Sequence, residues 1–236
     1  MSIISEPFLC PIEGRNENIM YVVFDIGGVV FEDIWEGIFF QKSTGILDLF
    51  DLNAQQLNRV CRNCWDRFAV MSLGSDPWEM LEVKYWKDIL RDIQIPWSVE
   101  ECIEYSQRFI IPIPGVDDLI NLLVKNRTQL GICSNQTAFW FERQLAVSKT
   151  LRFIDRKNMA LSFEQGATKG QKNNLLFKVV LDSFNCQPAE IIYIEDRIKH
   201  QQDSSDFGFK VIKFNKDESA LISTIKNQLE SYGVLL

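Results

Sequence analysis

The chain has 236 residues, of which 46% are hydrophobic and 24% are charged, a composition typical of a soluble globular protein. Its 25 lysines and arginines are outnumbered by 32 aspartates and glutamates, and the resulting net charge of −7 disfavours binding to nucleic acid or to an anionic membrane surface. The one histidine, His200, excludes any mechanism that needs two histidines and any histidine-rich metal cluster.

The beginning of the chain does not match a secretory signal, because acids and prolines occur early and no charged, apolar and small-residue regions follow one another. No segment approaches the run of about 18 apolar residues that a membrane-spanning helix needs. The six cysteines are scattered along a chain that is long enough to fold without disulfides. We therefore expect free thiols and a cytoplasmic protein.

The first apolar run, Tyr21–Phe24, predicts a buried strand that ends at Asp25. From residue 34 to residue 110 the pattern becomes helical, and five of the six tryptophans fall in this segment. Its clearest helical face is formed by Leu57, Val60, Cys61, Cys64 and Phe68. We call residues 34–110 the helical insertion and expect it to have an aromatic core.

After Pro112–Gly115, short apolar runs alternate with helical patterns. This alternation predicts a parallel sheet with helices on both of its faces. The expected helices are 116–123, 136–148, 172–184 and 198–206, and the expected strands are 129–133, 159–163, 191–194 and 211–214.

Polar residues stand where the predicted strands end. Asp25 follows the first strand, Ser134 follows the strand at 129–133, and Glu195 and Asp196 follow the strand at 191–194. Lys169 lies in the loop after the strand at 159–163. Ligands bind at this edge of parallel sheets. Converging carboxylates need a cation, for which Mg²⁺ is the best match, and a lysine and a hydroxyl beside them suit a phosphoryl group.

Four of these segments, in this order, resemble the four motifs of the haloacid dehalogenase-like (HAD) hydrolase superfamily. They are Phe24–Val30, Ser134–Asn135, Gly166–Lys169 and Ile194–Asp196. The resemblance covers nearly all of the chain from about residue 20. It implies an α/β fold in which residues 1–33 and 111–236 form a Rossmann-like core and residues 34–110 form an α-helical cap.

The resemblance also implies a chemistry. Asp25 would attack phosphorus and form an aspartyl-phosphate, which water then hydrolyses. Lys169 would stabilise the charge on the nucleophile and on the phosphate. Ser134 and Asn135 would bind the phosphoryl oxygens.

The same resemblance implies how a magnesium ion would be held. Asp25 and Asp196 would bind Mg²⁺ directly, and Glu195 would act through a water or by orienting the other ligands. In this family the residue two positions after the nucleophile contributes a backbone carbonyl, which Gly27 can supply.

The chain departs from the family pattern at two places. Most phosphatases of the family have a second aspartate, a general acid and base, where this chain has Gly27. General acid–base catalysis typically raises the reaction rate about 10²–10⁴-fold. Without that aspartate, we expect a slow enzyme or another proton donor. In the third motif both Lys169 and Lys172 are candidates for the lysine that stabilises the charge on the nucleophile. We favour Lys169, because it lies three residues after Gly166, as in the motif of the family.

Simpler interpretations stand beside these. Ser134 or Asn135 could cap the following helix, and Cys61 and Cys64 are best explained as packed side chains rather than a zinc or redox pair. His200 is either a structural hydrogen-bonding group near the site or the missing proton donor.

These observations favour a Mg²⁺-dependent phosphomonoester hydrolase that acts on a small phosphorylated metabolite such as a sugar phosphate. A catalytically impaired binding protein is the main alternative, which Gly27 supports. A 2-haloacid dehalogenase ranks lower, because those relatives usually have tyrosine at the position of Gly27. The sequence does not predict the oligomeric state.

Overall fold

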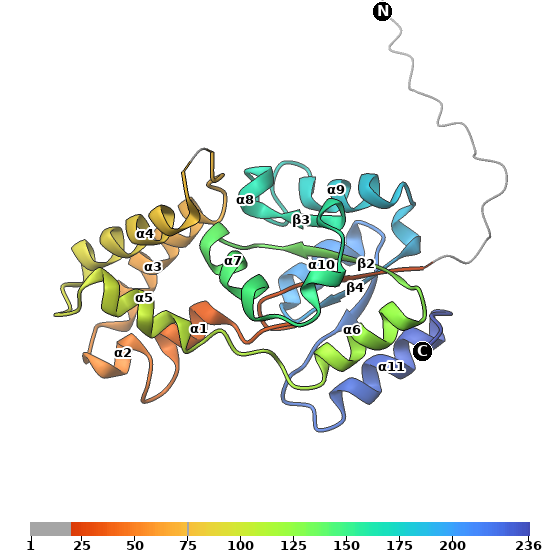
Figure 1. Ribbon diagram of the computed structural model, residues 1–236, viewed down its shortest axis with the longest axis horizontal. Coiled ribbons are helices and arrows are strands. Elements are labelled where there is room, and N and C mark those ends of the chain that lie inside the picture. Colours follow the sequence, from red (N-terminus) through yellow and green to blue (C-terminus); the bar gives the residue numbers. More distant parts are fainter. Residues whose placement is uncertain (1–19, 75) are drawn as a thin grey trace, which may run out of the picture.

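The computed structural model describes residues 20–74 and 76–236. Its centre is a five-stranded, fully parallel sheet with the strand order β3-β2-β1-β4-β5 (Figure 1). The predicted parallel α/β fold is therefore confirmed. The strands are β1 (Tyr21–Phe24), β2 (Gln129–Ser134), β3 (Met159–Leu161), β4 (Ile191–Glu195) and β5 (Lys210–Lys213). The predictions made for the first nineteen residues lie outside the described part of the chain.

Successive side chains of each strand point to opposite sides of the sheet, and helices cover both sides, so the sheet is buried on both faces. Val22 and Phe24 belong to the same buried cluster as the apolar stripes of α6 (Val116–Lys125) and α11 (Leu221–Ser231). Tyr21 and Val23 belong to a second cluster, built with α9 (Leu175–Phe184). β1 pairs with a strand on each side, so its carboxyl end lies in the middle of the edge formed by the strand ends.

The helical insertion forms its own group of helices at one end of the sheet (Figure 1). Side-chain caps begin three of them: Asp33 for α1, Asn53 for α3 and Ser98 for α5. All five residues of the predicted helical face of α3 are buried. The helices are α1 (Ile34–Phe40), α2 (Ile46–Leu49), α3 (Ala54–Phe68), α4 (Trp78–Ile93) and α5 (Val99–Gln107).

Two predicted boundaries are wrong for identifiable reasons. The strand expected at 159–163 ends at Leu161, and the short helix α8 (Ser162–Gln165) follows it directly. The helix expected from residue 172 begins at Leu175, because residues 172–174 have positive φ angles of 46°, 54° and 58° and form a left-handed turn. The remaining helices, α7 (Ala138–Val147) and α10 (Ile198–Asp206), match their predictions closely. No helix among the described residues is long and apolar enough to cross a membrane.

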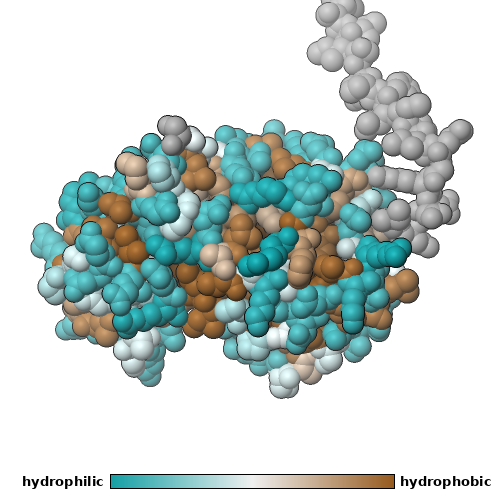
Figure 2. Space-filling view, in the orientation of Figure 1, coloured by the Kyte–Doolittle hydropathy of each residue, from teal (hydrophilic) through white to brown (hydrophobic). Residues whose placement is uncertain are grey.

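Helix α4 of the helical insertion packs against α7, which follows β2. Helix α3 contacts α7 as well, since the ring of Trp65 on α3 stacks on that of Trp140 on α7 with their centroids 5.6 Å apart. Beside them Arg143 Nε lies 3.0 Å from both carboxylate oxygens of Glu82, whose side chain is only 1% exposed. Hydrophobic side chains also reach the surface where the helical insertion meets the sheet (Figure 2). The insertion is therefore fixed to the sheet through α7.

Removing one member of this ion pair should destabilise the protein strongly, because the Glu82 carboxylate would stay buried without its partner. We expect Arg143→Ala to lower the free energy of unfolding by about 3 kcal/mol in urea denaturation. Arg91→Ala removes an arginine from an exposed ion pair and should leave the unfolding midpoint nearly unchanged. Equal effects of the two substitutions would contradict a stabilising role for the Glu82–Arg143 pair.

Candidate functional site

The carboxyl ends of β1 and β4 bring three acidic side chains together. Each of Asp25, Glu195 and Asp196 offers a carboxylate oxygen, and these oxygens all lie within 4.8 Å of one another. The backbone holds Asp25 in place, since its N–H donates to Ile194 O at 3.0 Å and its Oδ1 accepts from Ile26 N at 2.8 Å. The predicted convergence of these carboxylates is what the structure shows.

The ammonium group of Lys169 lies between two of these carboxylates. Its Nζ donates to Asp25 Oδ2 at 2.8 Å and to Glu195 Oε2 at 2.7 Å, and its side chain is 1% exposed. Lys172 instead donates to the backbone oxygen of Gly166 on the exposed side of the loop. Lys169 is thus the lysine that faces Asp25.

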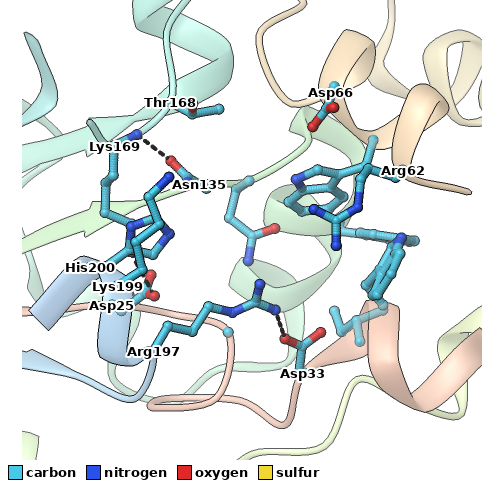
Figure 3. Close-up of a pocket in the computed structure, with 16 residues that line it drawn as sticks. Asp25, Asp33, Arg62, Asp66, Asn135, Thr168, Lys169, Arg197, Lys199 and His200 are labelled. Carbon is cyan, nitrogen blue, oxygen red and sulfur yellow. Dashed lines mark hydrogen bonds and ion pairs between the residues drawn. The ribbon is translucent and has the colours of Figure 1, made fainter. Parts of the chain in front are cut away.

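The residues that follow β2 approach the same place. Asn135 Oδ1 accepts a hydrogen bond from Lys169 N at 2.8 Å, so its side chain holds the loop that carries the lysine (Figure 3). The hydroxyl of Ser134 is buried and makes no well-formed hydrogen bond with the described residues, although it is near enough to Asp25 to act to lower the pKa of that carboxyl. Neither residue caps the next helix, because Thr137 occupies that position. The Ser134 hydroxyl is therefore available to a ligand.

Tyr193 completes the charge cluster and was not anticipated from the sequence. Its hydroxyl accepts from Lys169 Nζ at 2.9 Å and lies 2.8 Å from both Glu195 Oε2 and Cys133 O. The available signal was its register: Tyr193 and Glu195 are two residues apart on β4 and share one face of the sheet. Tyr193 orients the lysine and the glutamate without facing the solvent.

The cluster holds more negative charge than one ammonium can balance. Burial and the charge of Glu195 raise the pKa of Asp25, and these effects outweigh the nearby Lys169. Burial and the charge of Asp25 raise the pKa of Asp196 to about 8. Burial alone would lower the pKa of Lys169, but the two carboxylates beside it raise that pKa above its ordinary value. A further cation at this edge would relieve the surplus negative charge.

The donor set fits a hard divalent cation such as Mg²⁺, which prefers oxygen ligands. Among the described residues the buried Oδ1 of Asp196 has no hydrogen-bond partner, so it is free to coordinate. The backbone leaves room for the Asp196 carboxylate, because Gly28 has φ +79° and a Cβ there would lie 2.2 Å from Asp196 Oδ2. Asp25, Glu195 and Asp196 could hold the ion; the contribution of the Gly27 carbonyl stays a prediction.

Part of this cluster lines a cavity of about 310 Å³ between the sheet edge and the helical insertion (Figure 3). The wall on the sheet side includes Asp25, Gly27, Asn135 and Lys169. The opposite wall comes from α1 and α3 and includes Trp35, Arg62, Trp65 and Asp66. The cavity is mixed in character, with charged groups on both walls and aromatic rings on one.

His200 and Arg197 lie at the base of α10 and line the same cavity. Burial and, next, the charge of Lys169 lower the pKa of His200 to about 4, so its ring is neutral at neutral pH. The ring Nδ1 is 3.6 Å from Asp203 Oδ2 and makes no hydrogen bond with the described residues. Arg197 forms an ion pair with Asp33, the cap of α1, and so joins α10 to the start of the helical insertion.

The model of the haloacid dehalogenase-like hydrolase family matches residues 47–214, which is most of the chain. The protein belongs to this family. None of the curated proteins compared with this HAD-like hydrolase matches it significantly.

Several solved structures share the fold of this HAD-like hydrolase. A HAD family enzyme from Bacteroides thetaiotaomicron has a TM-score of 0.59 at 16% identity, over 86% of this chain and 97% of that one. A predicted HAD-like family hydrolase from Porphyromonas gingivalis has a TM-score of 0.56 at 18% identity, over 89% and 98%. An L-2-haloacid dehalogenase has a TM-score of 0.57 at 17% identity, over 84% and 87%. At these identities the likeness establishes the fold.

The raised pKa of Asp196 predicts a pH-dependent stability when no divalent cation is bound. In the folded protein this carboxyl keeps its proton up to about pH 8, whereas in the unfolded chain it releases the proton near the ordinary aspartate pKa of 3.8. Its contribution to stability is therefore present at low pH and lost as the pH rises toward 8. In EDTA, the urea midpoint of Asp196→Asn should fall less than that of the wild type over this range. Parallel curves for the two proteins would contradict this assignment.

Proposed function

We propose that the protein is a Mg²⁺-dependent phosphomonoester hydrolase that acts through an aspartyl-phosphate on Asp25. The observation that carries the proposal is the buried ammonium of Lys169, which contacts Asp25 Oδ2 and Glu195 Oε2 beside a third carboxylate. An ammonium at the nucleophile and a site for a cation are what the transfer of an anionic phosphoryl group requires.

In the first step of the proposed reaction a carboxylate oxygen of Asp25 attacks phosphorus and the bond to the leaving oxygen breaks. Lys169 neutralises charge that builds up between the nucleophile and the phosphoryl group. Ser134 donates its unpartnered hydroxyl to a phosphoryl oxygen, and Asn135 keeps the lysine loop in position. In the second step water attacks phosphorus, and the bond to Asp25 breaks to regenerate the carboxylate.

Asp25 and Asp196 would hold the magnesium ion, and Glu195 would orient it. When bound, the ion neutralises the carboxylates and withdraws charge from the phosphoryl oxygens. One of the solved HAD family structures with this fold, from Bacteroides thetaiotaomicron, contains magnesium and inorganic phosphate. For this chain the support comes from its own carboxylates and the free Oδ1 of Asp196.

A small phosphorylated metabolite such as a sugar phosphate suits the cavity. Its volume of about 310 Å³ is at the lower end of the range for small-molecule sites. Trp35 and Trp65 in the opposite wall offer aromatic faces on which a sugar ring can stack. Four buried free cysteines, Cys61, Cys64, Cys102 and Cys133, support a cytoplasmic protein.

A catalytically impaired binding protein is the second candidate, and Gly27 is the observation that favours it. Such a protein would bind a ligand in the same cavity without turning it over. A 2-haloacid dehalogenase ranks third, because its reaction needs no metal, whereas the three carboxylates of this site call for a cation.

Replacing the nucleophile should abolish the reaction while preserving the fold. With Mg²⁺ and a panel of phosphomonoesters, we expect Asp25→Asn to reduce phosphate release at least about 10³-fold, because an amide oxygen is a poor nucleophile. Asp182→Asn makes the same change at an exposed position of α9 and should retain full activity. Equal release by wild type and Asp25→Asn would overturn the proposed function.

Tyr193 should affect catalysis by positioning Lys169 and Glu195. We expect Tyr193→Phe to lower kcat about 10-fold with little change in KM, because the loss of hydrogen bonds to two charged groups costs about 1–2 kcal/mol. Tyr85→Phe is a matched control, since that buried hydroxyl has no hydrogen-bond partner among the described residues. A Tyr193→Phe enzyme with unchanged kcat would show that this contact is only structural.

A further inference from the structure

An unfilled space lies beside the nucleophile at Gly27. This residue lines the cavity with Asp25, and a Cβ built on it would meet nothing within 4 Å. Its φ is also outside the left-handed region, so a side chain at this position is free of backbone strain. Gly28 differs, because a Cβ there would collide with Asp196. Neither packing nor backbone geometry therefore explains the absence of a side chain at Gly27.

The cleavage of an ordinary alkyl phosphate needs a proton for the departing alkoxide, so the nearby groups matter. Asp33 cannot supply it, because its Oδ1 accepts from Glu36 N and its Oδ2 is paired with Arg197. Asp66 is an exposed carboxylate on α3, across the cavity from Asp25 (Figure 3).

The remaining polar groups near Asp25 are also poor proton donors. His200 lines the cavity as the neutral imidazole described above. Lys199 is exposed, and an ammonium group is a far weaker acid than a carboxylic acid. Apart from the nucleophile and the two carboxyls assigned to the cation, the cavity formed by residues 20–74 and 76–236 thus lacks a carboxylic acid placed to protonate a leaving group.

The cavity is better suited to a leaving group that departs as an anion. Arg62 and Lys199 line it, and neither forms an ion pair with another described residue. Arg197 adds a third cationic group at the base of α10, although Asp33 already pairs with it. Unpaired cations around an anion stabilise it without a proton transfer.

We propose, resting on the proposed phosphatase function, that the substrates are phosphates of acidic hydroxyl groups, whose leaving groups depart unprotonated. Acyl phosphates, aryl phosphates and anomeric sugar phosphates belong to this class in order of decreasing ease of departure. The Asp25 carboxylate forms the new bond to phosphorus, and the electron pair of the broken P–O bond leaves with the carboxylate, phenolate or anomeric oxygen. That anion takes its proton later, from solvent.

The test is the dependence of kcat/KM on leaving-group acidity, measured with Mg²⁺ over substituted phenyl phosphates, acetyl phosphate and glycerol phosphate. For the wild type we expect a steep fall along the series as the leaving group becomes less acidic. Gly27→Asp places a carboxyl group in the open space and should raise the rate with glycerol phosphate by about 10²-fold. The dependence of kcat/KM on leaving-group acidity then becomes weak. Gly27→Asn fills the same space without an acid and should leave the series steep.

Several results would overturn the proposal. One is a flat series for the wild type; His200→Asn or Lys199→Met would then identify the proton donor by making the series steep. Another is an equal gain from Gly27→Asp and Gly27→Asn. In both cases, if phosphate release still required Asp25, the proposed phosphatase function would be unaffected. If neither acetyl phosphate nor 4-nitrophenyl phosphate were hydrolysed, the proposed function itself would fail, and the inference with it.

Discussion

The contact of the Lys169 ammonium with Asp25 and Glu195 is the interaction on which the rest of the site depends. Two buried carboxylates whose oxygens lie within 4.8 Å of each other repel, and the loss of hydration costs several kcal/mol per charge. The lysine offsets this cost only because Tyr193 and the backbone N–H groups of Ile26 and Arg197 satisfy the remaining hydrogen-bonding atoms. The cluster is thus stable as a whole and poorly tolerant of the loss of any one member.

The sheet topology is what makes this contact possible. β1 lies between β2 and β4, so Asp25, which directly follows β1, has a neighbouring strand on each side. The lysine comes from a loop beyond β3, at the far edge, and reaches Asp25 because Asn135 holds that loop across the end of β2. The fold therefore assembles the site from four segments that are distant in sequence.

The helical insertion is connected to the same edge through specific polar contacts. The hydroxyl of Ser162 donates to Ala69 O at the end of α3 and accepts from Gln136 N, next to the phosphate-binding candidates. The Arg197–Asp33 pair forms a second link, between α10 and the start of α1. A rearrangement of the insertion would thus displace residues next to Ser134 and Asn135 and, through Arg197, the start of α10.

The sequence was sufficient to predict the parallel sheet and the convergence of Asp25, Ser134, Lys169 and the acidic pair, because strand ends follow from apolar runs. It could not reveal contacts that depend on how distant elements pack. The roles of Tyr193 and the Glu82–Arg143 pair arise only when β4 meets the lysine loop and α4 meets α7. The strand predicted through Phe163 ends at Leu161, and the hydroxyl of Ser162 instead joins two backbone segments from distant parts of the chain.

If Asp25 is the nucleophile, it becomes phosphorylated during turnover. Rapid acid quenching of the enzyme with Mg²⁺ and 4-nitrophenyl phosphate, followed by peptide mapping by mass spectrometry, tests it most directly. We expect a phosphoryl group on the peptide that contains Asp25, present only while substrate remains and absent from Asp25→Asn. Release of phosphate with this peptide unmodified at every time point, or a phosphoryl group on another residue, would contradict the role of Asp25 as nucleophile.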